Sequence, residues 1–80
     1  MLSICKDINM KNKKELLKQF GRNLCAERNR AGLSQYGLGE LTSLEGSYIG
    51  RIERAEVNPT ITTIIPILEV LNIPFEALYK

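Results

Sequence analysis

The chain lacks histidine and tryptophan, and its only cysteines are Cys5 and Cys25. Two thiols without histidine are too few for a structural zinc site, which takes four ligands. The absence of histidine, with no paired carboxylates at a cleft and no reactive-cysteine context, also leaves little with which to catalyse a reaction. We therefore expect no metal, no cofactor and no enzymatic activity.

Long apolar segments are absent as well. No run of residues is long enough to span a membrane. The first residues, MLSICKDIN, lack the apolar region and the cleavage site of a signal peptide. Two unpaired thiols fit a reducing compartment. We therefore expect a cytoplasmic protein without a membrane partner.

The composition that remains is ordinary for a globular protein, with 44% hydrophobic and 25% charged residues. Eighty residues make one domain with a small core, because a chain this short buries only about 60% of its unfolded surface. Residues 1–34 carry eight basic and three acidic side chains, whereas residues 35–80 carry three basic and six acidic side chains. A basic half indicates a polyanionic partner only weakly, since basic helix faces are usually just solvated.

Apolar residues repeat at intervals of three and four along most of the chain, which is typical of helices. Residues 1–12 lack this period, so we interpret them as a flexible leader, with Met10 as an alternative start, and place a single domain at residues 13–80. Gly32 fits a helix end and Ser34 fits a helix N-cap. The predicted helices span residues 13–31, 35–41, 46–54 and 61–71, with a last short helix after Pro74.

The run ITTIIPILEV, residues 61–70, has the weakest helical pattern. It is rich in β-branched residues and would pass as a strand, and Pro66 costs about 3 kcal/mol inside a helix. A lone strand would have no partner, however, and the flanking residues read as a helix cap and a helix stop. We therefore expect a helix with a bend, or a late start, near Pro66.

The segment GSYIGRIER, residues 46–54, has two unlike faces when it is drawn as a helix at about 100° per residue. Ile49 and Ile52 point to one side, and Glu53 lies beside them. An inward carboxylate needs a partner, since an unpaired buried charge is strongly unfavourable. The opposite face is small and basic, and it carries Ser47, Gly50, Arg51 and Arg54.

Two short helices joined by a turn of three or four residues form a helix-turn-helix. The stretch SQYGLGELTSLEGSYIGRIERAEVNPT resembles the helix-turn-helix of the lambda Cro and repressor-like family, also called the XRE family. The resemblance extends over roughly residues 15–79 and implies an all-α, five-helix lambda repressor-like domain. The positions that match the family pattern are Ser34, Gln35, Leu38, Leu44, Tyr48, Ile49, Ile52, Glu53, Arg54, Asn58, Pro59 and Thr60.

Some positions depart from the family pattern. Gly39 replaces the usual Ala, and Ala55 replaces the Gly that follows Ile-Glu-Arg. Ser43 stands where Gly commonly allows a left-handed turn, which is costly for Ser. Glu45 takes the N-cap place of Ser or Thr, where a carboxylate favours the helix dipole but repels nearby phosphate. Pro66 is unusual in the fourth helix. These departures affect which side chains would face a DNA groove, and they do not change the expected fold.

The resemblance implies that the GSYIGRIER segment is a recognition helix in the major groove of double-stranded DNA. Arg51 is the best candidate for base readout, because a guanidinium pairs bidentately with guanine O6 and N7. Ser47, one turn away, can also reach a base edge. By resemblance, Gln35 and Asn58 bind phosphates at helix N-termini, and Arg54 meets a phosphate further along.

Other positions of the same helix have two readings. Gly46 and Gly50 either remove bulk where the helix approaches the bases or allow close packing of helices. Tyr48 either contacts a phosphate or packs against the domain. Arg28 matches the family position that pairs with the glutamate, so we expect a largely buried Arg28–Glu53 ion pair between the first helix and the recognition helix.

The implied function is transcriptional regulation at a palindromic operator by a nucleoid-associated protein, and the small size resembles Cro-type repressors and restriction–modification controller proteins. One module makes few base contacts, so we expect a homodimer, and we expect no small-molecule ligand. The alternative is an antitoxin-like protein-interaction module of the same fold, with little DNA specificity. Candidate residues for the dimer interface are Ile73, Phe75, Leu78 and Tyr79.

Overall fold

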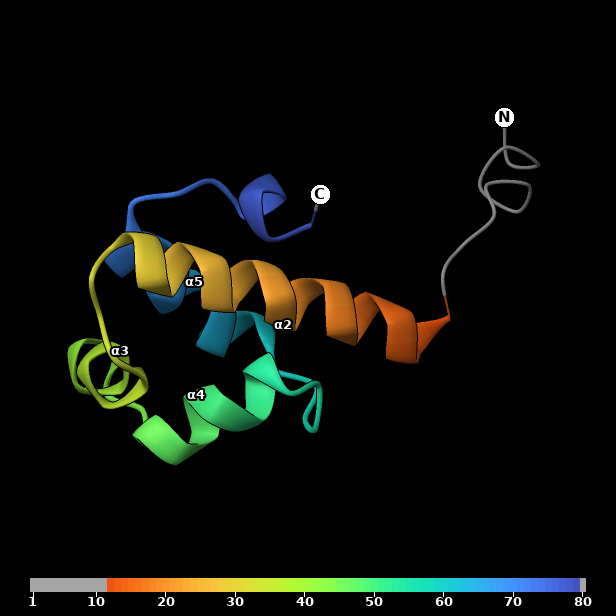
Figure 1. Ribbon diagram of the computed structural model, residues 1–80, viewed down its shortest axis with the longest axis horizontal. Coiled ribbons are helices and arrows are strands. Elements are labelled where there is room, and N and C mark those ends of the chain that lie inside the picture. Colours follow the sequence, from red (N-terminus) through yellow and green to blue (C-terminus); the bar gives the residue numbers. More distant parts are fainter. Residues whose placement is uncertain (1–11, 80) are drawn as a thin grey trace.

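A computed structural model of the chain describes residues 12–79, and the regular elements within this range are all helices, without strands. The elements are α2 (Lys13–Arg30), α3 (Gln35–Thr42), α4 (Gly46–Glu53), α5 (Ile61–Leu71) and the 3-10 helix η1 (Phe75–Leu78) (Figure 1). The all-α class is confirmed. The leader expected at residues 1–12 lies outside the described residues, apart from Asn12, which caps α2.

The expectation of five α-helices is wrong, because the described residues form four α-helices and η1. Pro74 precedes η1, and the backbone amides of Ala77 and Tyr79 donate to the carbonyls of Pro74 and Glu76, three residues back, at 3.0 and 3.1 Å. A segment this short closes turns of the 3-10 type instead of continuing as an α-helix.

Local capping signals define the helix ends. The side chain of Ser34 accepts a hydrogen bond from the backbone N–H of Gly37 at 2.8 Å, which caps α3 as expected. Gly32, with φ of +76°, follows the end of α2, and Asn72, with φ of 56°, ends α5. Both are left-handed positions, which Gly and Asn tolerate better than other residues do.

The helix α5 begins at Ile61 and runs through Pro66, so the predicted helix is confirmed and the late start is wrong. Pro66 has no N–H and cannot donate to the carbonyl of Thr62. Thr62 is exposed, so water can hydrate that carbonyl. Pro66 is the sixth of the eleven residues of α5, so the bond that it removes lies in the interior of the helix.

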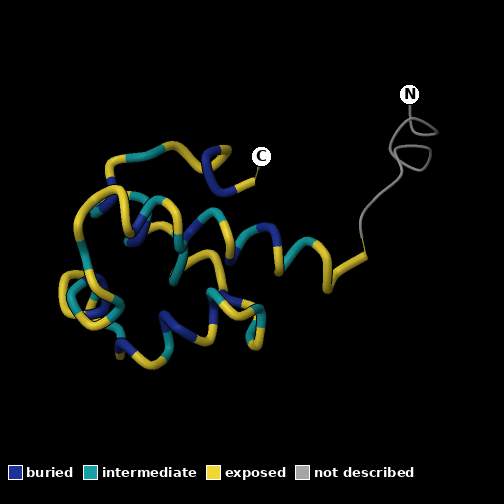
Figure 2. The backbone as a smooth tube through the Cα atoms, in the orientation of Figure 1, coloured by how far each residue is buried: buried dark blue, intermediate teal, exposed yellow. Residues whose placement is uncertain are grey.

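Buried side chains from every helix meet between α2, α4 and α5. In Figure 2, buried and exposed positions alternate along each helix, as amphipathic helices require. Leu41 of α3 is 59% exposed, because the inward side of that short helix is formed by Leu38 and Gly39. The core consists of Leu24, Leu38, Ile49, Ile52, Ile67, Leu71 and Leu78.

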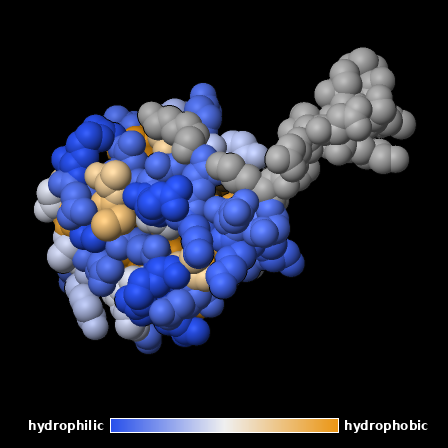
Figure 3. All heavy atoms as spheres, turned by 45° about the vertical axis from the view of Figure 1, so that its right-hand side comes forward, coloured by the Kyte–Doolittle hydropathy of each residue, from blue (hydrophilic) through white to orange (hydrophobic). Residues whose placement is uncertain are grey.

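The long helix α2 lies between η1 on one side and α4 on the other (Figure 1). Two amide side chains of α2 hold the end of the chain: Gln19 donates to the Tyr79 carbonyl at 3.0 Å, and Asn23 donates to the Leu78 carbonyl at 3.1 Å. In the view of Figure 3 the surface is largely hydrophilic, with small separate apolar patches. No helix among the described residues is long and apolar enough to cross a membrane.

Candidate nucleic-acid interface

The helices α3 and α4 pack closely around a tight turn. Ser43 adopts a left-handed conformation, with φ of 62°, and the Leu44 amide donates to the Gly39 carbonyl at 2.7 Å. A Cβ atom at Gly39 would lie only 3.0 Å from the Gly46 amide nitrogen, so only glycine fits there without a shift. The turn therefore has the geometry of a helix-turn-helix in which α4 is the second helix.

An ion pair fixes α4 against α2. Arg28 Nε donates to Glu53 Oε2 at 2.6 Å, and Arg28 Nη2 donates to Glu53 Oε1 at 3.1 Å. The two side chains are only 11% and 6% exposed. Arg28 also donates to the Leu33 carbonyl at 2.9 Å, and its hydrogen bond to Glu53 raises the pKa of its guanidinium. The structure thus brings together the two residues that the sequence pairs, and their hydrogen bonds compensate for the burial of both charges.

Gln35, at the start of α3, joins the same network. Its Nε2 donates to Glu53 Oε1 at 3.0 Å, so this carboxylate receives hydrogen bonds from both Arg28 and Gln35. Only one N–H of an amide group is used in such a bond, which leaves the second for another acceptor. Gln35 is half-buried and held in a fixed orientation at the edge of α4.

Gly46 and Gly50 are buried, so they do not lie on the exposed outer face of α4. A Cβ at Gly46 would overlap the Tyr36 ring and would lie 2.7 Å from Tyr36 Cα. A Cβ at Gly50 would lie 3.0 Å from Arg54 Nη1 and 3.1 Å from Gln35 Oε1. The groove-facing reading of these glycines is wrong: both make room for neighbouring side chains, because α3 crosses α4 directly above them.

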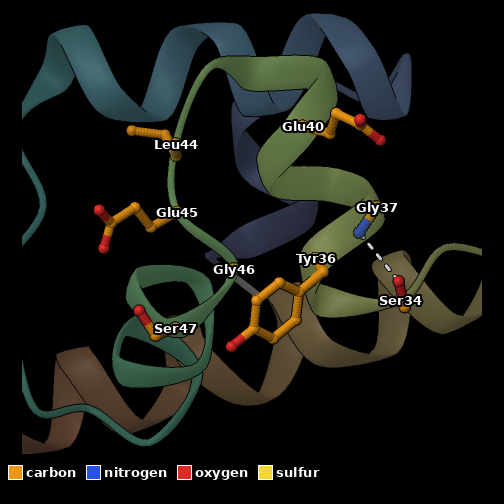
Figure 4. Close-up of a pocket in the computed structure, with 8 residues that line it drawn as sticks. All are labelled: Ser34, Tyr36, Gly37, Glu40, Leu44, Glu45, Gly46 and Ser47. Carbon is orange, nitrogen blue, oxygen red and sulfur yellow. Dashed lines mark hydrogen bonds between the residues drawn. The ribbon is translucent and has the colours of Figure 1, made fainter.

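Tyr36 is a candidate contact that the sequence reasoning missed. It is 70% exposed, and Figure 4 shows its ring against the start of α4, between Gly46 and Ser47. An aromatic residue directly after Gln35 was the available signal, since that position opens the first helix of the motif. The shallow hollow around this ring is lined by Ser34, Tyr36, Gly37, Glu40, Leu44, Glu45, Gly46 and Ser47.

The outer face of α4 carries the exposed residues Ser47, Arg51 and Arg54. Arg51 Nε lies 4.0 Å from Glu56 Oε1, and Arg54 Nε donates to Glu56 Oε2 at 2.9 Å. The hydrogen bond from Arg54 lowers the pKa of the Glu56 carboxyl, and the same bond raises the pKa of Arg54. Glu56 was also missed, because only a turn after α4 brings it back over the arginines.

Tyr48 is half-buried and packs against the hydrophobic core. Asn58 is exposed in the loop before α5, and no side chain caps the first amides of α5. The N-cap residue of α4, Glu45, likewise makes no side-chain cap. The first amides of both helices are therefore not occupied by a capping side chain, and helix N-termini of this kind attract anions.

The four residues expected at a dimer interface lie in different places. Leu78 is fully buried in the core of the single chain, so its assignment to an interface is wrong: the backbone turn of η1 points it toward α2. Ile73 is half-buried against the core. Phe75 and Tyr79 are 46% and 53% exposed, and their rings stack with centroids 6.3 Å apart.

The described part of the chain has no group of three metal-ligating side chains. Residues 26–78 match the HTH_3 family, described as helix-turn-helix. The control protein C.SmaI of Serratia marcescens is 39% identical over 66 residues, which cover 82% of this chain and 75% of that protein.

Solved structures share the fold. The restriction-modification controller protein C.AhdI from Aeromonas hydrophila has 35% identity and a TM-score of 0.75, over 79% of this chain and 96% of its own. An HTH_3 family transcriptional regulator from Vibrio cholerae has 32% identity and a TM-score of 0.75, over 81% of this chain but 36% of its own. A hypothetical transcription factor from Neisseria, at 21% identity and a TM-score of 0.77, supports the fold alone. The chain therefore belongs to the HTH_3 (XRE) family of DNA-binding helix-turn-helix transcriptional regulators.

Proposed function

We propose that this chain binds a palindromic operator as a homodimer, with α4 in the major groove. The observation that carries the proposal is the outer face of α4, where Ser47 and Arg51 are exposed one turn apart while Glu53 is locked to Arg28 beneath them. A rigidly seated helix with one small polar and one guanidinium side chain suits the readout of base edges.

Contacts to DNA phosphates would come from residues around the outer face of α4. Gln35 has one amide N–H left after its bond to Glu53, and Asn58 precedes the uncapped start of α5. Tyr36 offers an exposed ring and hydroxyl beside α4, and Arg54 offers a cation. Contacts of this kind set the register of the protein on DNA without reading its sequence.

The regulatory role that we propose is control of restriction–modification genes. C.AhdI is a restriction-modification controller protein, C.SmaI is a control protein, and the match to C.AhdI covers nearly its whole length.

Homodimerisation would double the base contacts and match them to a palindrome. The exposed stacked pair of Phe75 and Tyr79 is our candidate centre of the interface, with Ile73 at its edge. Exposed apolar surface of this kind is typical of protein contacts.

Selection of binding sites from a random duplex pool tests the proposal. We expect the wild-type protein to enrich a palindromic sequence with a guanine at symmetric positions. Failure to enrich any sequence, with no shift of random duplexes in gels at low salt, would instead favour the antitoxin-like interaction module.

A further inference from the structure

The carboxylate of Glu56 lies over Arg51 and Arg54, the two arginines of the outer face of α4. Its Oε2 accepts from Arg54 Nε at 2.9 Å, and its Oε1 accepts from Arg54 Nη2 at 3.4 Å. The same Oε1 lies 4.0 Å from Arg51 Nε. Both N–H groups on one edge of the Arg54 guanidinium are therefore engaged, whereas Arg51 is approached only at Nε and keeps its terminal nitrogens free.

The backbone fixes this arrangement. The Glu56 amide donates to the Arg51 carbonyl at 2.8 Å, and the Ala55 amide donates to the Ile52 carbonyl at 3.0 Å, with Ala55 left-handed at φ of 63°. These two bonds form the Schellman motif that ends many helices. Glu56 is therefore held one turn beyond Arg51 by the end of α4 itself, and its placement does not depend on a loose loop.

The other carboxylate in this region is not available to the arginines. Glu53 is occupied by Arg28 and Gln35 on the buried side. Glu56 is half-exposed, with 49% of its side chain accessible, and the hydrogen bond from Arg54 lowers the pKa of its carboxyl. Any phosphate that approaches Arg54 must therefore compete with an anion already in place.

We propose that Glu56 is an affinity-limiting residue, whose carboxylate withholds Arg54 from DNA phosphates while it leaves the terminal nitrogens of Arg51 free to read guanine. This inference rests on the proposed DNA-binding function. Phosphate contacts carry no sequence information, so this competition lowers the affinity for operator and arbitrary DNA alike and makes binding less dependent on salt.

The variant Glu56→Gln tests this inference with the full chain, a selected operator duplex and a scrambled duplex of equal length. Because exposed ion pairs contribute about 0.2–1 kcal/mol, affinity for the scrambled duplex should rise about 1.4- to fivefold for each subunit bound. The dependence of that affinity on salt should steepen by about 0.9 for each additional phosphate that the released arginine neutralises. Operator affinity should rise by the same factor, so the ratio of operator to scrambled affinity should stay unchanged.

Two matched variants separate this effect from general charge repulsion. In an Arg54→Ala background, Glu56→Gln should raise affinity for the scrambled duplex much less, since the cation that it frees is gone. Glu69→Gln removes the same charge from an exposed residue of α5, away from the outer face of α4 and from the stacked pair of Phe75 and Tyr79, and should leave both affinities unchanged. Sedimentation of each variant checks that the oligomeric state is equal.

An unchanged or reduced affinity of Glu56→Gln for the scrambled duplex would overturn the role of Glu56, as would an equal rise in affinity in the Arg54→Ala background or in Glu69→Gln. These outcomes leave the proposed function intact, because the wild-type protein still binds its operator. If the wild-type protein binds neither duplex, both the proposed function and the role of Glu56 are wrong.

Discussion

At the residue scale, Glu53 connects the core of the domain to its outer face. Its carboxylate accepts two hydrogen bonds from Arg28 and one from Gln35, and it is almost fully buried. Removing one partner of a buried pair leaves the other charge without compensation, which costs far more than the pair contributes.

We therefore expect Glu53→Ala to lower the free energy of unfolding by about 3–5 kcal/mol. Urea or thermal denaturation measures the loss. Glu69→Ala, at an exposed position of α5, is the control and should change stability by less than about 0.5 kcal/mol. A Glu53→Ala variant that melts at the wild-type temperature would show that the ion pair does not support the fold.

Arg51 and Gln35 are expected to serve DNA binding through different interactions. Arg51→Ala should cost about 1–3 kcal/mol at one symmetric base pair and flatten the preference there. Gln35→Ala should weaken binding to all sequences alike with little change in salt dependence, because no charged contact is lost. Competition binding to the operator and its single-base variants, at two salt concentrations, compares them. If Arg51→Ala keeps the wild-type base preference at every position, the recognition role of α4 must be abandoned.

At the scale of elements, the crossing of α2 and α4 depends on Gly21. A Cβ there would overlap the Glu53 carbonyl oxygen and lie 2.8 Å from the Ile52 carbonyl oxygen, both of them backbone atoms at the end of α4. Backbone atoms cannot move aside as a flexible side chain can, so an added methyl group would push the recognition helix away from α2.

Gly21→Ala should destabilise the domain by about 1–3 kcal/mol or more, even though alanine is the better helix former. Gly37→Ala is a matched control within a helix, since its new Cβ would meet only the Ser34 hydroxyl at 3.1 Å and the Leu33 side chain at 3.7 Å. Its effect should stay within about 1 kcal/mol of the wild type. Equal melting temperatures of the two variants would contradict the close crossing.

At the scale of the whole molecule, the apolar surface near the C-terminus has no partner within the described part of the chain. Phe75 and Tyr79 stack on each other beside the buried Leu78, and α2 holds the backbone beneath them through Gln19 and Asn23. A twofold contact at this rigid surface would place two copies of α4 at a fixed separation, and major-groove recognition calls for about 34 Å.

Phe75→Glu should therefore shift the protein to a monomer in sedimentation and weaken binding to the full palindrome much more than binding to a half-site. Leu41→Glu is the control, because it places the same charge at another exposed apolar residue, on α3. The proposed interface is wrong if Phe75→Glu sediments as a dimer, or if the wild-type protein remains a monomer at high concentration.

Much of the helical layout could be predicted from the sequence, because the signals that end helices are local. Ser34, Gly32 and Asn72 act on backbone groups within a few residues of themselves, and the structure ends the helices at or next to them. The inward side of α4 was also predictable, since Ile49 and Ile52 follow the helical period. The fifth element was misassigned in type, because four residues after Pro74 carry too little pattern to separate a 3-10 helix from an α-helix.

The sequence by itself determined where helices form, which residue types α4 offers, and that Glu53 needs a cation. Only the tertiary structure decided what lies against each of them. The crossing of α3 over α4 buries Gly46 and Gly50, the turn after α4 places Glu56 on Arg54, and η1 turns Leu78 into the core. The physical reason is range: caps and helical periods act over one or two turns, whereas burial and charge pairing depend on side chains that packing brings together from distant parts of the chain.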